Sequence, residues 1–200
     1  MKIEIRKLTP GLAKDYVQFF DETPHDVNID EQKCYCVTWR SDSSYIHGEP
    51  HWFPTREERR ARAKEFVSTG SIQGYLAYCG DKIVGWCNAN ADCQLCVNYL
   101  RSYWPIEEYR EDVKVKSVFC FMIAPEMQRK GIATQLLEHV CKDAANEDFD
   151  FVEAYVNKKF ISTAHDFRGP MEMYEKCGFF KYAELGDRVV VRKALKSDKS

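Results

Sequence analysis

Residues 118–137 constrain the fold of this chain more than any other stretch. An apolar run that ends at Ile123 and Ala124 meets Pro125, passes through a short polar loop, and continues with apolar residues at helical spacing. A strand, a tight loop and a helix N-terminus therefore follow one another. The first amides of such a helix lack partners within it, and the helix dipole adds positive charge at that end. This order of elements favours the binding of an anion.

The loop itself has the composition of a phosphate site. Gly131 and Ala133 are small enough for a phosphate to approach the backbone, and Arg129 and Lys130 add positive charge. The sequence of this loop matches neither a Walker loop nor a Gly-x-Gly-x-x-Gly dinucleotide motif. What remains is Gln-x-x-Gly-x-Ala, starting at Gln128. Taken alone, this pattern also fits an ordinary strand-to-helix turn.

The remaining periodicity predicts an α/β protein built around one sheet. Strands are expected at 2–8, 74–79, 82–87, 115–123, 151–157, 179–183 and 189–194, and helices at 10–21, 55–68, 132–145 and 171–177. Thr9 is the expected N-cap of the first helix, and Thr55 with Glu58 forms a capping box for the second. Four arginines on the second helix alternate with glutamates, which indicates a solvated face: Arg56, Arg59, Arg60 and Arg62.

Two irregular segments interrupt this order, at about 23–54 and 93–114. Both are rich in aromatic residues, and the first is too aromatic for a disordered linker. The first either buries its own aromatics or faces a substrate, and the sequence leaves both interpretations open. Residues 1–195 are expected to form a single domain, followed by a disordered tail at 196–200.

Charge and hydropathy exclude several classes of function. The net charge of −2 gives no support to nucleic-acid binding, and no apolar run approaches the ~20 residues of a membrane helix. The N-terminus lacks the apolar core of a signal peptide, so we expect a cytoplasmic protein without a membrane or nucleic-acid partner, either a monomer or a homodimer.

Nine cysteines are many for 200 residues. In a reducing compartment most are expected to be small core residues with free thiols. Cys34-x-Cys36 and Cys93-x-x-Cys96 lie in irregular segments, where four thiolates could bind zinc. Since Cys-x-Cys is an uncommon spacing for such a site, we predict no metal.

Three motifs in register resemble the GCN5-related N-acetyltransferase (GNAT) superfamily. The Gln-x-x-Gly-x-Ala loop is similar to its pyrophosphate loop, Met173-Tyr174-Glu175-Lys176-Cys177-Gly178-Phe179 to its Leu-Tyr-Glu-Lys-x-Gly-Phe signature, and Asn157 ends a strand where the family often has Asn. The likeness spans about residues 2–194. It implies the GNAT fold, with one mixed, mostly antiparallel sheet of about seven strands and about four flanking helices.

The resemblance also implies a donor, acetyl-CoA, and a set of residues that bind it. The amides of Gln128, Arg129, Lys130, Gly131, Ile132 and Ala133 would take the pyrophosphate. The backbone of Phe121 and Ile123 would pair with the pantetheine arm, with the Ile123 amide facing the thioester oxygen. Asn157 would bind the pantetheine or a water, and Tyr174 would protonate the departing thiolate. The alternatives for Tyr174 and Asn157 are a packed helix tyrosine and a turn cap.

The general base and the acceptor are less determined. Relatives that modify histones carry a Glu at the position of Ser117, so we predict that Glu153, on the next strand, is the base or orders a base water; Glu111, Asp112 and Asp92 are further candidates. The expected acceptor is the primary amine of a small molecule, such as a polyamine. Acetylation of peptides or proteins, and non-catalytic sensing of acyl-CoA, remain as alternatives.

Overall fold

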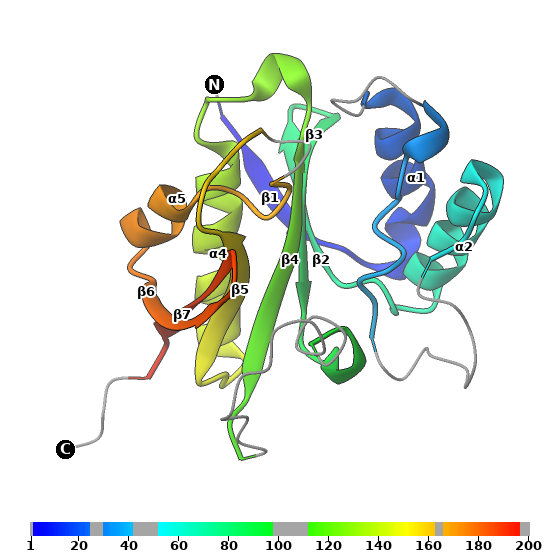
Figure 1. The fold of residues 1–200 in the computed structure, drawn as a ribbon. Helices are drawn as coiled ribbons and strands as arrows, with labels where there is room; N and C mark the ends of the chain where they lie inside the picture. Colours follow the sequence, from blue (N-terminus) through cyan, green and yellow to red (C-terminus); the bar gives the residue numbers. More distant parts are fainter. Residues whose placement is uncertain (1, 25–29, 42–51, 98–111, 163–165, 197–200) are drawn as a thin grey trace.

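The computed structural model describes residues 2–24, 30–41, 52–97, 112–162 and 166–196. Its seven strands form one sheet in the order β1-β2-β3-β4-β5-β7-β6 (Figure 1). The strands are β1 Glu4–Lys7, β2 Gly74–Cys79, β3 Lys82–Asn90, β4 Val115–Ile123, β5 Phe151–Asn157, β6 Phe180–Leu185 and β7 Arg188–Ala194. The β4–β5 pair is parallel and all other neighbours are antiparallel. The predicted seven-stranded, mostly antiparallel sheet is confirmed.

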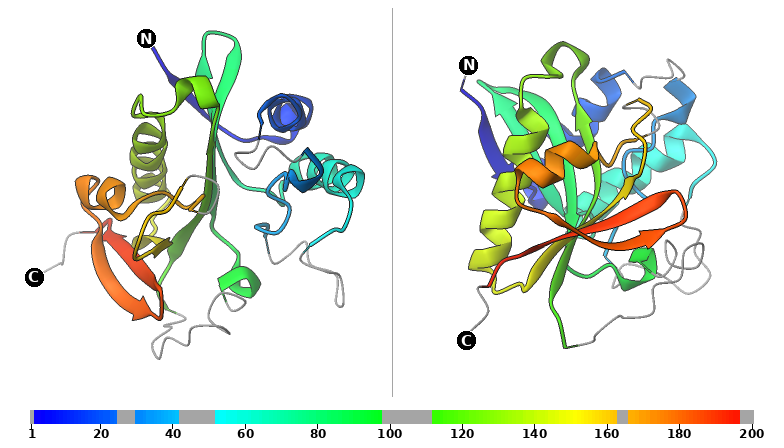
Figure 2. Two further views of the ribbon diagram at one scale, coloured as in Figure 1. Left: turned by 45° about the horizontal axis from the view of Figure 1, so that its top comes forward. Right: turned by 60° about the vertical axis from the view of Figure 1, so that its left-hand side comes forward.

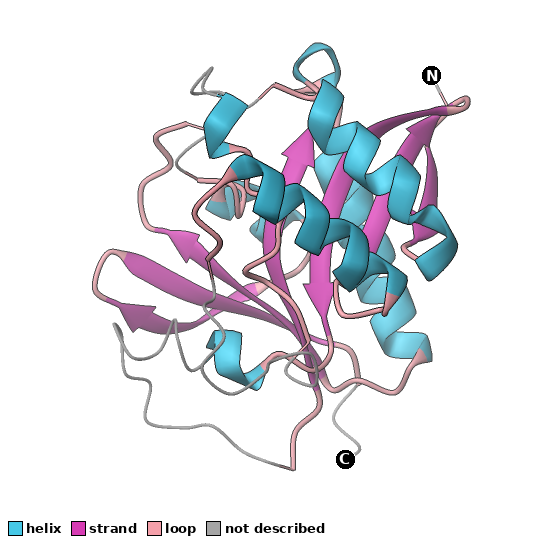
Figure 3. Ribbon diagram, turned by 90° about the vertical axis from the view of Figure 1, so that its right-hand side faces the viewer, coloured by secondary structure: helices cyan, strands magenta, loops and turns pink. Residues whose placement is uncertain are grey.

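Helices cover both faces of the sheet and enclose two cores. Helices α1 (Ala13–Glu22) and α2 (Arg56–Ser68) pack on one face, and α4 (Ile132–Asn146) and α5 (Met171–Lys176) on the other (Figures 2 and 3). Trp86 and Phe119 are fully buried in the core under α1 and α2, while Leu136 and Tyr174 are fully buried in the core under α4 and α5. Among the described residues, no helix is both long and apolar enough to cross a membrane.

Strands β4 and β5 separate after a short paired segment. They pair only from Val115–Phe151 to Val118–Ala154, so the C-terminal half of β4 has no partner strand on that side. A bulge in β4 lies directly after the last residue that pairs with β5. On the other side of β4, Asn88 pairs with Cys120, but the next residue of β3, Ala89, pairs with Val118. The extra residue is Phe119. We refer to the space between the diverging strands as the splay.

Most local signals are confirmed, with one correction at the start of α1. The Thr55–Glu58 capping box forms as predicted, and Gly178 takes the left-handed conformation after α5. By contrast, the Thr9 side chain caps nothing: Pro10–Leu12 forms a 3₁₀ turn, and the α-helix begins only at Ala13. Gly11, a weak helix former directly after Pro10, accounts for the delay.

Arg59 contradicts the prediction of a solvated arginine face on α2. Its side chain is 1 % exposed and ties the described part of the 23–54 segment to α2. The guanidinium donates hydrogen bonds to four backbone carbonyls, those of Glu31, Lys33, Phe53 and Pro54. A loop with so many carbonyls facing inward needs a buried donor, and Arg59 supplies it.

Some predictions fall outside the described residues. These are the acidic and aromatic residues at 98–111 (Glu111 among them), the histidines at 25, 47 and 51, and residues 197–200 of the tail. In the described part of 23–54, Tyr35, Val37 and Trp39 are buried. This supports the interpretation in which the segment buries its own aromatics.

Candidate active site

The loop before α4 has the geometry of an anion site. Gly131 is the N-cap of the 15-residue helix α4 and takes a left-handed conformation, with φ 75°. A side-chain carbon added at Gly131 would meet nothing within 4 Å, so the space in front of the helix N-terminus is open. Arg129 and Lys130 are exposed beside it. Open space, unpaired helix amides and two cations together fit a pyrophosphate group.

The first turn of α4 lies against the end of β4. A carbon added at Gly85 of β3 would come within 2.9 Å of the Ile123 side chain and 3.2 Å of that of Ile132. The Gln128 side-chain amide donates to the Ile123 carbonyl at 3.4 Å. Ile132 is buried and Ala133 half-buried, as the first residues of the helix. The anion site and the open half of β4 are therefore continuous.

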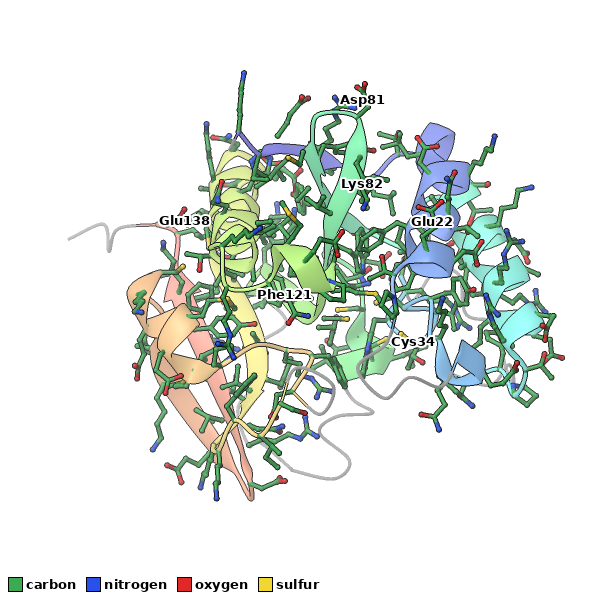
Figure 4. The ribbon with its side chains drawn as sticks, turned by 90° about the horizontal axis from the view of Figure 1, so that it is seen from above. Glu22, Cys34, Asp81, Lys82, Phe121 and Glu138 are labelled. Atoms are coloured by element: carbon green, nitrogen blue, oxygen red, sulfur yellow. The ribbon has the colours of Figure 1, made fainter. Side chains whose placement is uncertain are left out.

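Two backbone amides of β4 face the splay. The amide of Ala124 donates to the Val84 carbonyl at 3.0 Å, which makes Ile123 and Gly85 a non-hydrogen-bonded antiparallel pair. The amide of Ile123 consequently points away from β3, and the alternation places that of Phe121 on the same side. Figure 4 shows Phe121 near the centre of the molecule, between α4 and the helices of the other face. These amides could pair with an extended ligand, as the sequence predicts.

The segment between β5 and α5 already occupies part of the splay. The carbonyl of Phe167 accepts a hydrogen bond of 2.6 Å from the Phe121 amide. Figure 1 shows the part of this segment that precedes α5, residues 166–170, near the C-terminal half of β4. A ligand that pairs with Phe121 must therefore displace the Phe167 carbonyl, whereas the predicted contact at Ile123 lies farther along the strand.

Tyr174 lies on α5 with its hydroxyl directed at the same segment. The side chain is fully buried, and its hydroxyl donates to the Arg168 carbonyl at 2.6 Å. Burial raises the pKa of Tyr174 well above its usual value, so the phenol keeps its proton at neutral pH. The structure thus places the predicted acid next to the splay, with its proton engaged.

Glu153 is held in a buried network. It is 1 % exposed, binds the Arg192 guanidinium, and accepts a hydrogen bond from the Tyr155 hydroxyl. It also stands directly opposite Ser117 in the β4–β5 register, so the carboxylate missing at Ser117 is present on the neighbouring strand. A base role for Glu153 would require release of its ion pair.

Asn157 contacts a loop residue. Its amide nitrogen donates to Asp166, whose carboxylate also accepts hydrogen bonds from the backbone amides of Ile161 and Ser162. The side-chain oxygen of Asn157 is buried without a partner among the described residues. That oxygen is the atom available to a pantetheine or a water. Of the other base candidates, Asp92 accepts a hydrogen bond from Ser41.

All nine cysteines, which lie within the described residues, are free thiols. The part of the chain that the structure describes holds no group of three or more potential metal ligands. The Cys96 thiol donates hydrogen bonds to the carbonyls of Thr38 and Arg40 at 3.4 and 3.7 Å. These bonds connect residues 93–97 to the described loop at 30–41.

We expect the buried thiols to react slowly in the folded protein. Burial raises the pKa of Cys141 to about 12 and that of Cys36 well above its usual value, so neither forms much thiolate at pH 8. Pulse labelling with iodoacetamide and mass spectrometry should modify both at least ~100-fold more slowly in the native protein than in urea. Cys79, which is partly exposed, is the internal control; native labelling of Cys141 as fast as in urea would contradict the prediction.

Sequence reasoning missed three residues that border the splay. Arg168 and Phe167 lie in an aperiodic segment, and the contact of Phe167 is made by its backbone, so its side chain gives no signal. Trp39 stacks on Phe119 with ring centroids 4.9 Å apart, and Phe119 stacks on Tyr155 at 6.1 Å. Aromatic content marked the segment that contains Trp39, but not which residue reaches the sheet.

Comparisons with known proteins agree with this geometry. The model of the Acetyltransferase (GNAT) family matches residues 21–179. No curated protein matches the chain. Among solved structures, the chain is similar to the PaiA N-acetyltransferase of Thermoplasma acidophilum in complex with coenzyme A, with 15 % identity, TM-score 0.51, and 97 % of this chain and 99 % of that one covered.

The names of two further proteins of known structure indicate different kinds of acceptor. The chain is similar to a spermidine N-acetyltransferase of Vibrio cholerae (14 % identity, TM-score 0.54, 96 % of this chain and 94 % of that one covered). It is also similar to a ribosomal-protein alanine acetyltransferase of Vibrio fischeri (13 % identity, TM-score 0.54, 100 % and 97 % covered). At such identities these likenesses show the fold and leave the acceptor open.

Proposed function

The chain belongs to the GNAT family of acetyl-CoA-dependent acetyltransferases, and on that premise we propose that it acetylates the primary amine of a small molecule. The observation that carries the proposal is the splay: the amides of Phe121 and Ile123 face it, and the open N-terminus of α4 directly follows. We further propose that residues 1–195 form one domain and that the protein works in the cytoplasm, where its nine thiols stay reduced.

Each part of the donor site has a distinct task. Acetyl-CoA supplies an activated acetyl group as a thioester. The amides from Arg129 to Ala133, with the side chains of Arg129 and Lys130, hold the pyrophosphate, whereas the Gln128 amide, which the sequence also predicts for this role, donates to the Pro125 carbonyl at 3.3 Å. The amides of Phe121 and Ile123 hold the extended arm and stabilise the negative charge that develops on the thioester oxygen.

Tyr174 would complete the transfer. The lone pair of the free amine forms the new N–C bond while the C–S bond breaks and its electron pair goes to sulfur. Tyr174 gives its proton to that sulfur and recovers one from solvent, and the amine loses its extra proton to water. The proton that the amine loses balances the one that Tyr174 recovers, so the products are an N-acetylated amine and free CoA thiol. Asn157 would orient the arm or a water at the splay.

The experiment is release of CoA thiol from acetyl-CoA with a panel of small amines and of peptides with free N-termini. Turnover of small amines supports the proposal, whereas turnover of the peptides alone replaces it with peptide acetylation. Binding of acetyl-CoA without turnover of any amine would favour an acyl-CoA sensor. A small-molecule acceptor is favoured because the described part of the 23–54 segment packs closely against the face of the sheet that carries α1 and α2.

Gly131 offers a direct test of the donor half. Replacing Gly131 with Ala places a methyl group before the helix amides and should weaken acetyl-CoA binding by at least ~10-fold, measured by calorimetry. Gly70→Ala is the matched control, because Gly70 has nearly the same φ (77° against 75°) and also has nothing within 4 Å of an added carbon. Both variants should lose similar stability, about 1–2 kcal/mol. Equal acetyl-CoA affinities for the two variants would refute the assignment of the loop.

A further inference from the structure

Arg168 is a buried cation that no carboxylate of the described residues contacts directly. Its side chain is 5 % exposed, and within the described ranges of the chain it forms no ion pair and its guanidinium donates no hydrogen bond. Burial, with Arg188 nearby, lowers the pKa of Arg168 to about 10, so the group remains charged at neutral pH. A buried charge of this kind is costly unless something binds it.

Arg168 contacts residues of both cores, one through its backbone carbonyl and the other through its side chain. Its carbonyl accepts the Tyr174 hydroxyl from the core under α4 and α5. Its guanidinium lies 5.6 Å from the ring of Trp39, which belongs to the opposite core, and 4.4 Å from the ring of Phe167. The cation therefore lies beside the point where the proposed donor and the acceptor meet.

The neighbouring charges do not compensate Arg168. Asp166 is close enough to raise the pKa of Arg168 somewhat. However, the Asp166 carboxylate already accepts hydrogen bonds from Asn157 and from two backbone amides. Glu153 binds Arg192. Arg188, the second neighbour, carries the same sign as Arg168. Among the described residues, Arg168 therefore has no carboxylate in direct contact, and an anionic ligand could supply one.

The chemistry of the group selects the anion. A guanidinium presents two parallel N–H donors that match a carboxylate or a phosphate. Among aromatic rings, a singly charged, planar carboxylate is less costly to bury than a doubly charged phosphate. Since one face of the splay belongs to the donor, this carboxylate belongs to the acceptor.

We infer that Arg168 binds the carboxylate of the acetyl acceptor, and that the acceptor is a small amino acid carrying its primary amine and its carboxylate in one molecule. The inference rests on the proposed function and replaces a polyamine-like acceptor with an anionic one. It adds no step to the transfer, because Arg168 fixes the acceptor while its amine reacts. Arg168 is thus a specificity-determining residue.

Matched acceptor pairs test the inference. CoA release is measured with amino acids and with the amines formed by their decarboxylation: leucine and 3-methylbutylamine, phenylalanine and 2-phenylethylamine, lysine and cadaverine. In the wild type, kcat/KM should favour the carboxylate-bearing member by about 100-fold, mostly through KM. In Arg168→Gln this ratio should fall to near one. In Arg168→Lys, which keeps the charge but lacks the two parallel N–H donors, the ratio should take an intermediate value. Preference of the wild type for cadaverine over lysine would overturn the inference.

Two controls separate selectivity from folding. Arg6→Gln removes an exposed arginine on β1 and should keep the wild-type ratio. Arg168→Met fills the same space without a buried charge, so its Tm should be no lower than that of the wild type while its selectivity is lost. If Arg168→Gln lowers kcat/KM equally for both members of each pair, Arg168 is structural and the inference fails.

A second measurement does not depend on turnover. The Tm is recorded with CoA plus an N-acetylated amino acid, and with CoA plus the corresponding N-acetylated amine. A larger rise with the N-acetylated amino acid in the wild type, but not in Arg168→Gln, supports the inference. Equal rises in the wild type overturn it. Absence of turnover on every amine, with acetyl-CoA bound, would refute the proposed function and leave this measurement to judge the carboxylate site.

Discussion

Replacing Tyr174 with Phe is expected to lower kcat about 100-fold while acetyl-CoA affinity stays near that of the wild type. The phenol lies beside the splay and keeps its proton at neutral pH. It can therefore protonate a departing thiolate once it turns from the Arg168 carbonyl. Steady-state kinetics and calorimetric binding of acetyl-CoA measure the two quantities separately.

The same substitution also removes a buried hydrogen bond, and Tyr16 provides the control for that loss. Tyr16 is fully buried too, and its hydroxyl donates to the Tyr35 carbonyl at 2.9 Å, in the opposite core. Tyr16→Phe and Tyr174→Phe should each destabilise the fold by about 1–3 kcal/mol. Only Tyr174→Phe should lose kcat. Equal kcat values for both variants would assign Tyr174 a packing role.

Replacing Glu153 with Gln is expected to destabilise the protein by about 3 kcal/mol, because it leaves the buried Arg192 cation without its carboxylate. Urea unfolding measures the change. The double variant Glu153→Gln/Arg192→Met should recover most of it, since both charges are then absent. Glu184→Gln removes an exposed carboxylate that pairs with two lysines and should leave the urea midpoint unchanged.

Kinetics of the Glu153 variant separate the two roles proposed for this residue. If Glu153 is the base or orders a base water, Glu153→Gln alters kcat and the pH–rate profile below the temperature at which it unfolds. If it serves only to neutralise Arg192, stability falls while the pH–rate profile keeps its shape. An unchanged profile together with unchanged kcat would end the base hypothesis.

The sequence predicts the elements with strong local signals and fails where partners are distant. The strand at 115–123 and the capping box of Thr55 and Glu58 are predicted from periodicity and capping chemistry, and both are confirmed. Arg59 and Arg168 were not predicted to be buried. An arginine signals exposure by its charge, and only the folded chain shows the carbonyls or the aromatic rings that surround it.

In the candidate site, too, features within one continuous segment follow from the sequence, whereas contacts between distant segments do not. Motif spacing predicts roles for the loop before α4 and for Tyr174, because each motif lies within one continuous segment. The Phe167 carbonyl on the Phe121 amide could not be anticipated, since it joins two segments 46 residues apart through backbone atoms alone. Glu153 was predicted as a base from its place on the strand, and its partner Arg192 follows only from the β5–β7 register.

The hydrogen bond from Phe121 to Phe167 also bears on how the protein avoids association with other chains. Where β4 and β5 diverge, β4 presents unpaired backbone groups, which in other proteins attract foreign strands and promote aggregation. The Phe167 carbonyl covers one of these groups while no donor is bound. In the function that we propose, the pantetheine arm of acetyl-CoA would take the place of the Phe167 carbonyl at this amide. A strand edge inside the sheet is thus covered at Phe121 by the protein's own loop.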